Sequence, residues 1–322
     1  MGNNIARQAP LLAVIVPCYN EEQVMEQTAA RLRAVLDSMI GDALIRPGSF
    51  VYFVDDGSVD STWSIIEKMS RENAMVKGLK LSRNFGHQNA LIAGLTELKD
   101  RADCTVSIDA DLQQDEKAMP GFVRRYLEGA DIVFGVRNDR SSDSLMKRST
   151  ALAFYRLMRL MGVNIKSNHA DYRLVSRRAA ETIADYGEVN IFLRGMFTDI
   201  GFRTAEAGFD VSERTAGESK YSAGRMIGFA LDGITSFSVV PLRVVAIVGF
   251  FILMFSLLMI GYALVKTLVV GGTVPGWAST VIPVYVLGGL QIMSIGIVGE
   301  YVGKIYKEVK KRPRYIKEEE IN

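Results

Sequence analysis

The sequence predicts an α/β fold with a mostly parallel sheet covered by helices, followed by a C-terminal hairpin of two transmembrane helices. In residues 1–135, short β-rich runs alternate with longer segments of helical periodicity, an order typical of a parallel sheet. Two late segments, 244–265 and 277–299, contain no charged residue, and each would be about 33 Å long as a helix. The 322-residue chain is 48% hydrophobic, with a mean hydropathy of +0.13, which is more apolar than a soluble enzyme needs.

Five apolar runs are the predicted strands of this sheet. They span residues 11–16, 50–54, 76–81, 104–108 and 131–135. The segments between them fit helices; in 21–37, apolar residues recur on one helical face, and Asn20 precedes them as the predicted N-cap. Folds of this class bind ligands at the carboxyl ends of their strands. The residues that follow each strand are therefore the candidate site.

The predicted strand ends carry side chains that suit a nucleotide and its phosphates. They offer an aromatic face, carboxylates for base or ribose groups, and arginines for phosphate. In chain order, these residues are Pro17, Tyr19, Glu21, Asp56, Arg83 and Arg137.

The fourth predicted strand leads into Asp109-Ala-Asp111-Leu-Gln113, which places two carboxylates and an amide at one strand end. Carboxylate and amide oxygens suit a hard ion such as Mg²⁺ or Mn²⁺, which commonly bridges a protein to a diphosphate. An Asp-x-Asp alone is more often a solvated loop. The other strand ends make Asp109, Asp111 and Gln113 a predicted metal site.

Several other chemistries are disfavoured. The chain has no Gly-x-Gly-x-x-Gly after a strand and no P-loop, which argues against a dinucleotide-binding dehydrogenase and a P-loop enzyme. His87 and His169 have no ligand-type partners at metal spacing, so structural or supporting roles are expected. Cys18 and Cys104 lie in apolar runs and are expected to be buried thiols in a reducing compartment. A net charge of +2 predicts no nucleic-acid partner.

Four segments together resemble a known family. Val-Pro-Cys-Tyr-Asn-Glu-Glu at 16–22, Asp-Asp-Gly-Ser-Val-Asp-Ser at 55–61, Ser-Arg-Asn-Phe-Gly at 82–86 and Asp-Ala-Asp-Leu-Gln at 109–113 resemble the GT-A glycosyltransferases of family 2. Segments 171–174, 214–221 and 312–315, with the late hairpin, are similar to its polyprenyl-phosphate branch. That branch includes dolichyl-phosphate mannose synthase and the bactoprenol glucosyltransferases. The resemblance covers residues 10–316 or so.

The resemblance implies a hexosyltransferase that moves one sugar, with inversion, from a nucleotide-diphosphate sugar to a polyprenyl phosphate such as undecaprenyl phosphate. UDP-glucose is the first choice of donor, on family frequency alone, and nothing in the sequence separates it from other UDP-sugars. The implied nucleotide-binding residues are Pro17, Tyr19, Glu21, Asp56, Arg83 and Asp109.

The resemblance also implies roles around the reacting groups. Asp109, Asp111 and Gln113 would hold Mg²⁺ or Mn²⁺ and the diphosphate. Asp171 occupies the place proposed for a base, with equal odds that it orients Arg173 or a sugar hydroxyl. The residues implied to grip phosphates are Arg137, Arg148, Arg214 and Lys220.

The late segments predict an integral protein of the cytoplasmic membrane. Lysines and arginines are concentrated between 304 and 317, whereas 267–276 carries no charge, so the positive-inside rule places both ends in the cytosol. The expected organisation is a cytosolic catalytic domain at 1–220, an amphipathic juxtamembrane helix at 221–240, two membrane helices within 241–303, and a basic cytoplasmic tail at 304–322. Related bacterial enzymes suggest a homotetramer.

Three alternatives stay open on the sequence. A phosphatase of the haloacid-dehalogenase type also carries Asp-x-Asp after an apolar strand, although on its first strand. A membrane subunit that senses nucleotides without catalysis would share the binding residues. The two late segments could instead be buried core helices. A processive polysaccharide synthase is disfavoured because Gln-x-x-Arg-Trp is absent.

Overall fold

The computed structural model describes residues 7–111, 113–138, 169–189, 191, 193–210, 238–270 and 277–322. By its internal contacts the chain divides into two units. The first holds a sheet, the helices that cover it and the C-terminal strand. The second holds two long helices.

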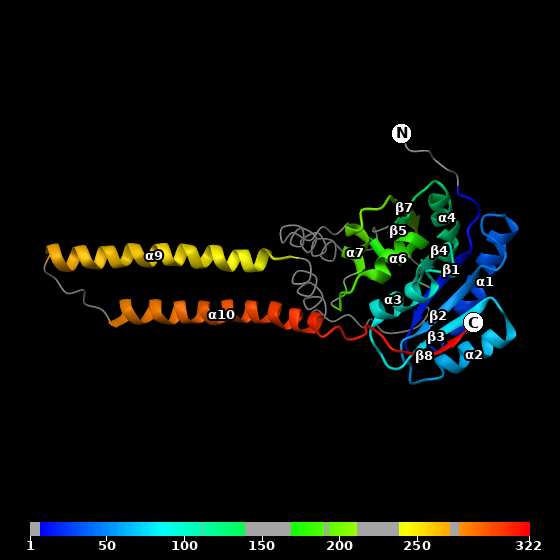
Figure 1. Cartoon of the computed structure of the whole chain (residues 1–322), viewed down its shortest axis with the longest axis horizontal. Helices are drawn as coiled ribbons and strands as arrows, with labels where there is room; N and C mark the ends of the chain where they lie inside the picture. The colour runs from blue at the N-terminus through cyan, green and yellow to red at the C-terminus, as the bar shows by residue number, and fades with distance from the viewer. Residues whose placement is uncertain are drawn as a thin grey trace. The chain divides into compact units, whose positions relative to one another are not determined.

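The sheet of the first unit has eight strands in the described part of the chain, in the order β7-β5-β6-β4-β1-β2-β3-β8 (Figure 1). Their bounds are β1 Leu12–Cys18, β2 Phe50–Asp55, β3 Val76–Leu81, β4 Cys104–Ser107, β5 Ile132–Arg137, β6 His169–Ser176, β7 Thr204–Phe209 and β8 Lys317–Ile321. The five strands predicted from apolar runs are present within a few residues of their expected bounds.

The directions of the strands place the carboxyl ends of β1 to β5 at the same edge of the sheet. Strand β1 pairs in parallel with β2 and β4, β2 pairs in parallel with β3, and β5 pairs in parallel with β7. Strand β6 is antiparallel to both β4 and β5, and β8 is antiparallel to β3. The carboxyl ends of β1 to β5 therefore share one edge of the sheet with the first residues of β6 and β8. This shared edge is called the carboxyl edge below.

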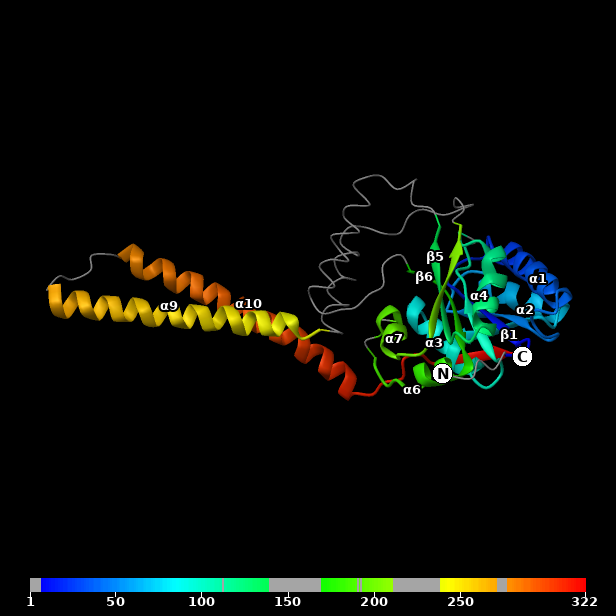
Figure 2. The same cartoon turned by 90° about the horizontal axis from the view of Figure 1, so that it is seen from above.

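Helices cover both faces of the sheet, as the sequence predicts for parallel strands. They are α1 Met25–Gly41, α2 Thr62–Glu72, α3 His87–Leu98, α4 Met119–Leu127, α6 Arg177–Asp185 and α7 Leu193–Asp199, with a short 3₁₀ turn at Glu116–Ala118. Figure 2 shows α1, α2 and α4 on one face and α3, α6 and α7 on the other.

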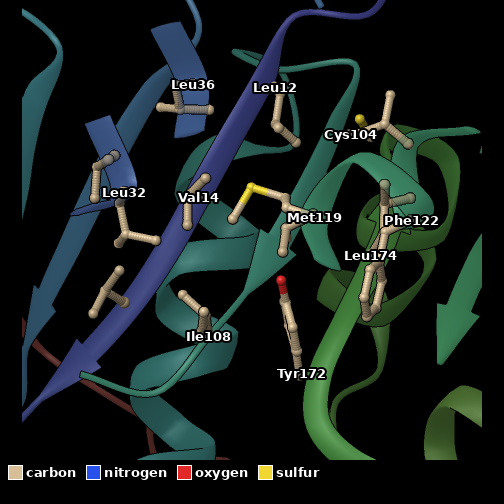
Figure 3. Close-up of a cluster of buried hydrophobic side chains, with 14 of the residues drawn as sticks. Leu12, Val14, Leu32, Leu36, Cys104, Ile108, Met119, Phe122, Tyr172 and Leu174 are labelled. Atoms are coloured by element: carbon tan, nitrogen blue, oxygen red, sulfur yellow. The ribbon is translucent and has the colours of Figure 1, made fainter. Parts of the chain in front are cut away.

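The core lies between the sheet and these helices. All seven residues of β1 are buried, and Leu32 and Leu36 of α1 pack toward it (Figure 3). On the neighbouring part of the same face, Phe122 of α4 stacks on Tyr172 of β6, with ring centroids 4.4 Å apart. Apolar burial of this kind provides the main favourable term in folding. It fixes the strand ends that build the candidate site.

The two cysteines are buried and free, as the sequence predicts. Burial is the largest cause that raises the pKa of both thiols, and nearby carboxylates add to the rise. Protonated, buried thiols behave as small apolar side chains.

The predicted N-cap at Asn20 is wrong. Helix α1 begins at Met25, and Val24 is its N-cap residue, without a side-chain capping bond. Asn20 instead has a left-handed backbone, with φ of 55°, and its Oδ1 accepts the N–H of Val59 at 2.9 Å. Asparagine tolerates this conformation better than most residues, and here it serves a loop contact between strand ends.

The last residues of the chain join the sheet, a feature that the sequence did not predict. Strand β8, red in Figure 1, pairs with β3 although the two are far apart in the sequence. Its Glu320 accepts a hydrogen bond from the Tyr52 hydroxyl at 3.0 Å and pairs with Arg101. The Trp63 indole N–H donates to Glu319 at 3.2 Å. Part of the expected basic tail is thus an edge strand of the first unit.

The second unit contains α9 Val240–Val270 and α10 Trp277–Val309, which include the two predicted membrane segments. The Tyr301 hydroxyl donates to the carbonyl of Ser238 at 2.6 Å, so the start of α9 lies beside the second half of α10. Among the described residues, one segment, Val286–Val309, is long and apolar enough to cross a membrane, judged by length and composition. The shorter apolar helix Val240–Ile252 lies in α9. Most of the expected juxtamembrane helix falls outside the described residues.

Candidate active site

The loops after β1 and β2 are joined at the carboxyl edge by reciprocal hydrogen bonds. The N–H of Asn20 donates to Ser58 Oγ at 2.9 Å, and the Asn20 side chain accepts from Val59. One step further, the N–H of Glu22 donates to Asp60 at 3.3 Å, while its carboxylate accepts the N–H of Ser61 at 3.0 Å. Each loop satisfies backbone groups of the other, so the two strand ends form one rigid rim.

Asp56 connects this rim to the loop after β3. Its carboxylate accepts the N–H of Phe85 at 2.7 Å and the N–H of Gly86 at 2.9 Å. Burial is the largest influence and raises the pKa of Asp56, while the two N–H donors oppose that rise. The expected nucleotide-binding carboxylate is therefore also a brace between loops.

The close approach of these loops requires a glycine. Gly57 has a φ of +69°, and a Cβ on it would lie 2.3 Å from the carbonyl carbon of Arg83. Only glycine has both the conformational freedom and the space for this contact. The Arg83 guanidinium lies 4.0 Å from the centre of the Phe85 ring, a cation–π arrangement.

The other expected nucleotide-binding residues lie on the same rim. Pro17 pairs in register with Val54, and Tyr19 follows β1 with 38% of its surface exposed. The N–H of Glu21 donates to Thr62 Oγ1 at 3.0 Å. The structure thus brings together all five residues expected at the ends of β1, β2 and β3. These strand ends carry an exposed aromatic ring, carboxylates and an arginine, which are groups that suit a nucleoside and its phosphate.

The side chain of Gln114 holds Asp109, which follows β4. Its Nε2 donates to Asp109 Oδ2 at 2.7 Å, and its Oε1 accepts the Asp109 N–H at 3.2 Å. Gln114 is buried, with 7% of its surface exposed. The expected ligand Gln113 contacts Asp111 through its own main chain, whose N–H donates to Asp111 Oδ1 at 3.1 Å. These hydrogen bonds thus fix the loop after β4, which carries the carboxylates of both Asp109 and Asp111.

Burial and neighbouring charges both act on the carboxylate of Asp109. Loss of solvent raises its pKa to about 6; the nearby carboxylates of Asp171 and Asp111 add to the rise, and His87 opposes it. Among the described residues, no group of three or more histidine, cysteine or acidic side chains is arranged to hold a metal ion. Mg²⁺ and Mn²⁺ sites that also use substrate phosphates need only one or two carboxylates. The Asp109 and Asp111 oxygens therefore fit such an ion.

Asp171 enters the site from the first residues of β6, on the other side of β4. Its main-chain oxygen accepts from Ser107 Oγ at 2.7 Å, which ties β6 to the end of β4. Its carboxylate pairs with Arg173 and with Arg194, whose Nε and Nη2 each lie 3.4 Å from it. Although burial raises the pKa of Asp171, Arg173 and Arg194 lower it to about 2. A carboxylate with so low a pKa is a poor proton acceptor near neutral pH.

His87, the first residue of α3, approaches the same cluster. Its Nε2 lies 3.7 Å from Asp109 Oδ1. The next residue, Gln88, accepts the N–H of Leu193 on its Oε1 at 2.9 Å and so ties α3 to α7. The expected supporting role of His87 is compatible with this position. The side chain of His169 lies outside the described part of the structure.

The expected phosphate-gripping residues are only partly described. Arg137 ends β5 and is exposed, on the same carboxyl edge as Asp109 because β5 and β4 run in the same direction. Arg148, Arg214 and Lys220 lie outside the described residues.

Sequence reasoning missed two residues of this site. Gln114 directly follows the recognised motif, and a second glutamine beside the first was the only signal. Arg194 follows Leu193 at the start of a short helix, and nothing in its neighbourhood separates it from a surface arginine. Both become visible only when folding brings them to Asp109 and Asp171.

Comparisons with known proteins find related sequences. The model of the family described as "Glycosyl transferase family 2" matches residues 13–184. The chain is 48% identical over 306 residues to "Uncharacterized glycosyltransferase YkoT" of Bacillus subtilis (strain 168), covering 95% of this chain and 90% of that protein. It is 37% identical over 307 residues to "SfII prophage-derived bactoprenol glucosyl transferase" of Shigella flexneri, covering 95% and 96%.

Among solved structures, the chain resembles glucosyl-3-phosphoglycerate synthase from Mycobacterium tuberculosis, in complex with Mn²⁺, UDP and glucosyl-3-phosphoglycerate. The identity is 16%, the coverage is 70% of this chain and 77% of that one, and the TM-score is 0.43.

Proposed function

The chain belongs to glycosyl transferase family 2 and is a glycosyltransferase with the GT-A fold, and from this premise we propose that its acceptor is a polyprenyl phosphate. It transfers one hexose from a nucleotide-diphosphate sugar to undecaprenyl phosphate or a similar lipid, at the cytoplasmic face of the membrane. The main support is its likeness to a bactoprenol glucosyl transferase along 95% of the chain, membrane segments included. The products are a polyprenyl phosphosugar and a nucleoside diphosphate.

The donor is a UDP-sugar, with UDP-glucose the first choice. The rim formed by the ends of β1, β2 and β3 receives the nucleoside, with the exposed Tyr19 ring as a stacking surface. Glu21 and Asp56 offer carboxylates to base or ribose groups, and Arg83 offers a cation to a phosphate. The name of the Shigella flexneri relative supports a glucosyl donor.

A divalent ion, Mg²⁺ or Mn²⁺, belongs to the diphosphate end of this site. Asp109 and Asp111, with Gln113, would hold it, and the buried Gln114 fixes the Asp109 carboxylate. When bound, the ion neutralises charge that develops on the departing diphosphate. Asp111 lies two residues from Asp109 in the same loop, so both carboxylates are available to such an ion.

The acceptor needs no strong base. A phosphate monoester has a second pKa of about 6, so its oxygen is already an anionic nucleophile at neutral pH. Asp171, with a pKa of about 2 under the influence of burial, Arg173 and Arg194, is better suited to orient cations than to remove a proton. Attack opposite the departing diphosphate inverts the sugar in a single displacement.

The membrane attachment is a hairpin of α9 and α10. Strand β7 precedes these helices and β8 follows them in one sheet, so if the intervening chain crosses a membrane it must do so an even number of times, which supports a hairpin of two spans. Several large apolar side chains of the two helices are exposed, which is typical of a lipid-facing surface. They include Phe251, Phe255, Leu258, Ile292 and Ile295. Two crossings would leave both ends on the same side, and the lysines and arginines between 304 and 317 support the cytosolic side for them and for the catalytic domain.

The two rival functions fit less well. A phosphatase of the haloacid-dehalogenase type carries its Asp-x-Asp after the first strand, whereas Asp109 follows β4. A nucleotide sensor would not need carboxylates and cations grouped at a reacting centre. Assembly as a homotetramer remains a prediction from related bacterial enzymes.

The test is a panel of nucleotide sugars, each incubated with the purified full chain, undecaprenyl phosphate and Mg²⁺ or Mn²⁺. We expect release of the nucleoside diphosphate that depends on the lipid phosphate, with undecaprenol as the control lipid that lacks phosphate. Nucleotide binding without turnover for every donor would favour the sensor, and release of inorganic phosphate alone would favour the phosphatase.

A further inference from the structure

The C-terminal segment, residues 311–322, contacts the loop after β3. This segment belongs to the first unit, and its strand β8 runs antiparallel to β3 (Figure 1). The start of β8 therefore lies at the carboxyl edge, where β3 ends. There the N–H of Ser82 donates to the carbonyl oxygen of Ile316 at 3.0 Å. Because Ser82 directly precedes Arg83, the C-terminal segment holds the loop that carries this expected phosphate-binding residue.

The rim holds the same loop by separate contacts. A Cβ on Gly57 would lie 2.3 Å from the carbonyl carbon of Arg83, and the carboxylate of Asp56 accepts two main-chain N–H groups further along the loop. The main chain of Arg83 is thus fixed on both sides in sequence. The bond from Ser82 to Ile316 fixes it before, and the bonds to Asp56 fix it after. The position of Arg83 depends on the C-terminal segment as well as on the rim.

Glu320 docks β8 on the sheet. Its side chain is only 13% exposed, it accepts the Tyr52 hydroxyl at 3.0 Å, and it pairs with Arg101 and Lys317. Although burial raises the pKa of Glu320, hydrogen bonds from these three partners lower it below its usual value. The carboxylate is therefore charged at neutral pH and joins β8 to β2 and to the residue range between α3 and β4.

The docking of β8 is local, so a ligand at the loop can change it measurably. Among the described strands β8 is the last in the sheet order and pairs with β3 alone, and three of its five residues are exposed. Edge elements with few buried contacts open at a much lower free energy than the core does. A modest gain in order at the loop after β3 therefore shifts the opening of β8.

We propose that the C-terminal segment is part of the donor site: docked by Glu320, it positions through Ile316 the loop that presents Arg83 to the donor diphosphate. This inference rests on the proposed function, which assigns Arg83 to a phosphate of the nucleotide. Coupling between two sites is reciprocal. If the docked strand favours the binding of a nucleoside diphosphate, the bound nucleotide favours the docking of β8 by the same factor.

Hydrogen exchange of the full chain with Mn²⁺ tests this coupling without any substitution. The exchange rate of the β8 amides is compared without nucleotide, with uridine and with UDP. We expect UDP, and not uridine, to slow this exchange by about fivefold or more. Helix α6 is the internal control, because it begins at Arg177, which pairs with Asp103 at the opposite edge of the sheet. Its exchange should be the same in all three samples.

Glu320→Ala weakens the docking of β8 without changing the loop itself. Calorimetry with Mn²⁺ measures the preference for UDP over uridine, which we expect to fall by about fivefold or more. Glu320→Gln should keep part of the preference, because its amide oxygen can still accept the Tyr52 hydroxyl. Glu318→Ala is the matched control on the same strand. Glu318 is 46% exposed and pairs with Lys80 at 3.0 Å, and such surface pairs contribute little.

The outcomes separate the inference from the proposed function. UDP binding that leaves the exchange of β8 unchanged, or slows α6 equally, would overturn the inference while the proposed function stands. A preference within about twofold of the parent in a folded Glu320→Ala variant would do the same, since a strand that only stabilises the fold lowers the melting temperature alone. If that variant does not fold, exchange in the parent decides. A parent that does not prefer UDP to uridine would overturn both.

Discussion

Gln114 holds Asp109 through both ends of its side-chain amide, with Nε2 on the carboxylate at 2.7 Å and Oε1 on the main-chain N–H at 3.2 Å. The preceding residue, Gln113, contacts the same loop through its main chain. Two adjacent glutamines therefore have different functions. One fixes the geometry of the carboxylate, and the other is the expected ligand of the metal and diphosphate.

Gln114→Ala should destabilise the protein more than Gln113→Ala does. The first change removes two hydrogen bonds from a buried loop, at a cost of about 1–3 kcal/mol, whereas alanine at 113 retains the main-chain bond to Asp111. Denaturant unfolding of the two variants provides the comparison. Equal free energies of unfolding would contradict the role of Gln114 as the brace of Asp109.

Asp111→Asn should reduce the affinity for Mn²⁺ and the transferase activity together. The substitution keeps the size of the side chain but removes one of the two charges that a hard cation needs. Asp115→Asn is the matched control, because Asp115 caps a turn through the N–H of Lys117 at 3.0 Å, and asparagine can do the same. Full Mn²⁺ affinity in a folded Asp111→Asn variant would exclude Asp111 as a ligand.

Gly57→Ala should distort the rim between the loops after β2 and β3. The new Cβ meets the Arg83 main chain at 2.3 Å in addition to the strain of a positive φ. Gly48→Ala shares the positive φ, with its nearest contact a Leu11 side-chain atom at 3.7 Å. We expect Gly57→Ala to cost about 1–3 kcal/mol more in unfolding free energy and to weaken UDP binding. Equal free energies of unfolding for the two variants would contradict the close approach of Gly57 to the Arg83 main chain.

Protonation of Asp131 in acid should lower the stability of the protein. Its buried carboxylate pairs with Arg7 and Arg178. Although burial raises the pKa of Asp131, the hydrogen bonds from Arg178 and then Arg7 lower it below its usual value. Since the folded-state pKa is the lower one, the stabilisation is present above the unfolded pKa of about 3.9 and is lost as the pH falls through the folded-state pKa.

The measurement is the difference in unfolding free energy between the parent and Asp131→Asn. We expect about 2 kcal/mol at pH 7 and a smaller difference at pH 3. The exposed Asp37 of α1 provides a control, Asp37→Asn, for which little change is expected at either pH. A difference for Asp131→Asn that does not change between the two pH values would count against the pairing.

Apolar runs predicted β1 to β5 because most residues of each strand are buried. They could not predict β6, which carries Asp171 and Arg173 among its apolar residues. Arg173 is buried only because Asp171 and the ring of Phe197 surround it, and these contacts depend on the folded chain. Strand β8, with the sequence Lys-Glu-Glu-Glu-Ile, has no apolar run, and its partners Tyr52 and Arg101 are distant in the sequence.

The residues of the candidate site also divide into those that the sequence could place and those that it could not. Residues at the ends of apolar strands, such as Tyr19, Asp56 and Asp109, could be placed from the sequence because parallel strands share a carboxyl edge. Asn20 was misassigned because the preference of asparagine for helix N-caps and for left-handed loop conformations cannot be separated locally. The position of Arg194 in the site depends on the packing of α7 against α3, which no local sequence pattern predicts.

The most direct test of the central claim is mass spectrometry of the lipid product formed by the full chain from UDP-glucose and undecaprenyl phosphate. The account predicts a lipid that keeps one phosphate and gains one hexose, together with release of UDP. A lipid diphosphate sugar with release of UMP, or no lipid product with any nucleotide sugar in the panel, would contradict it.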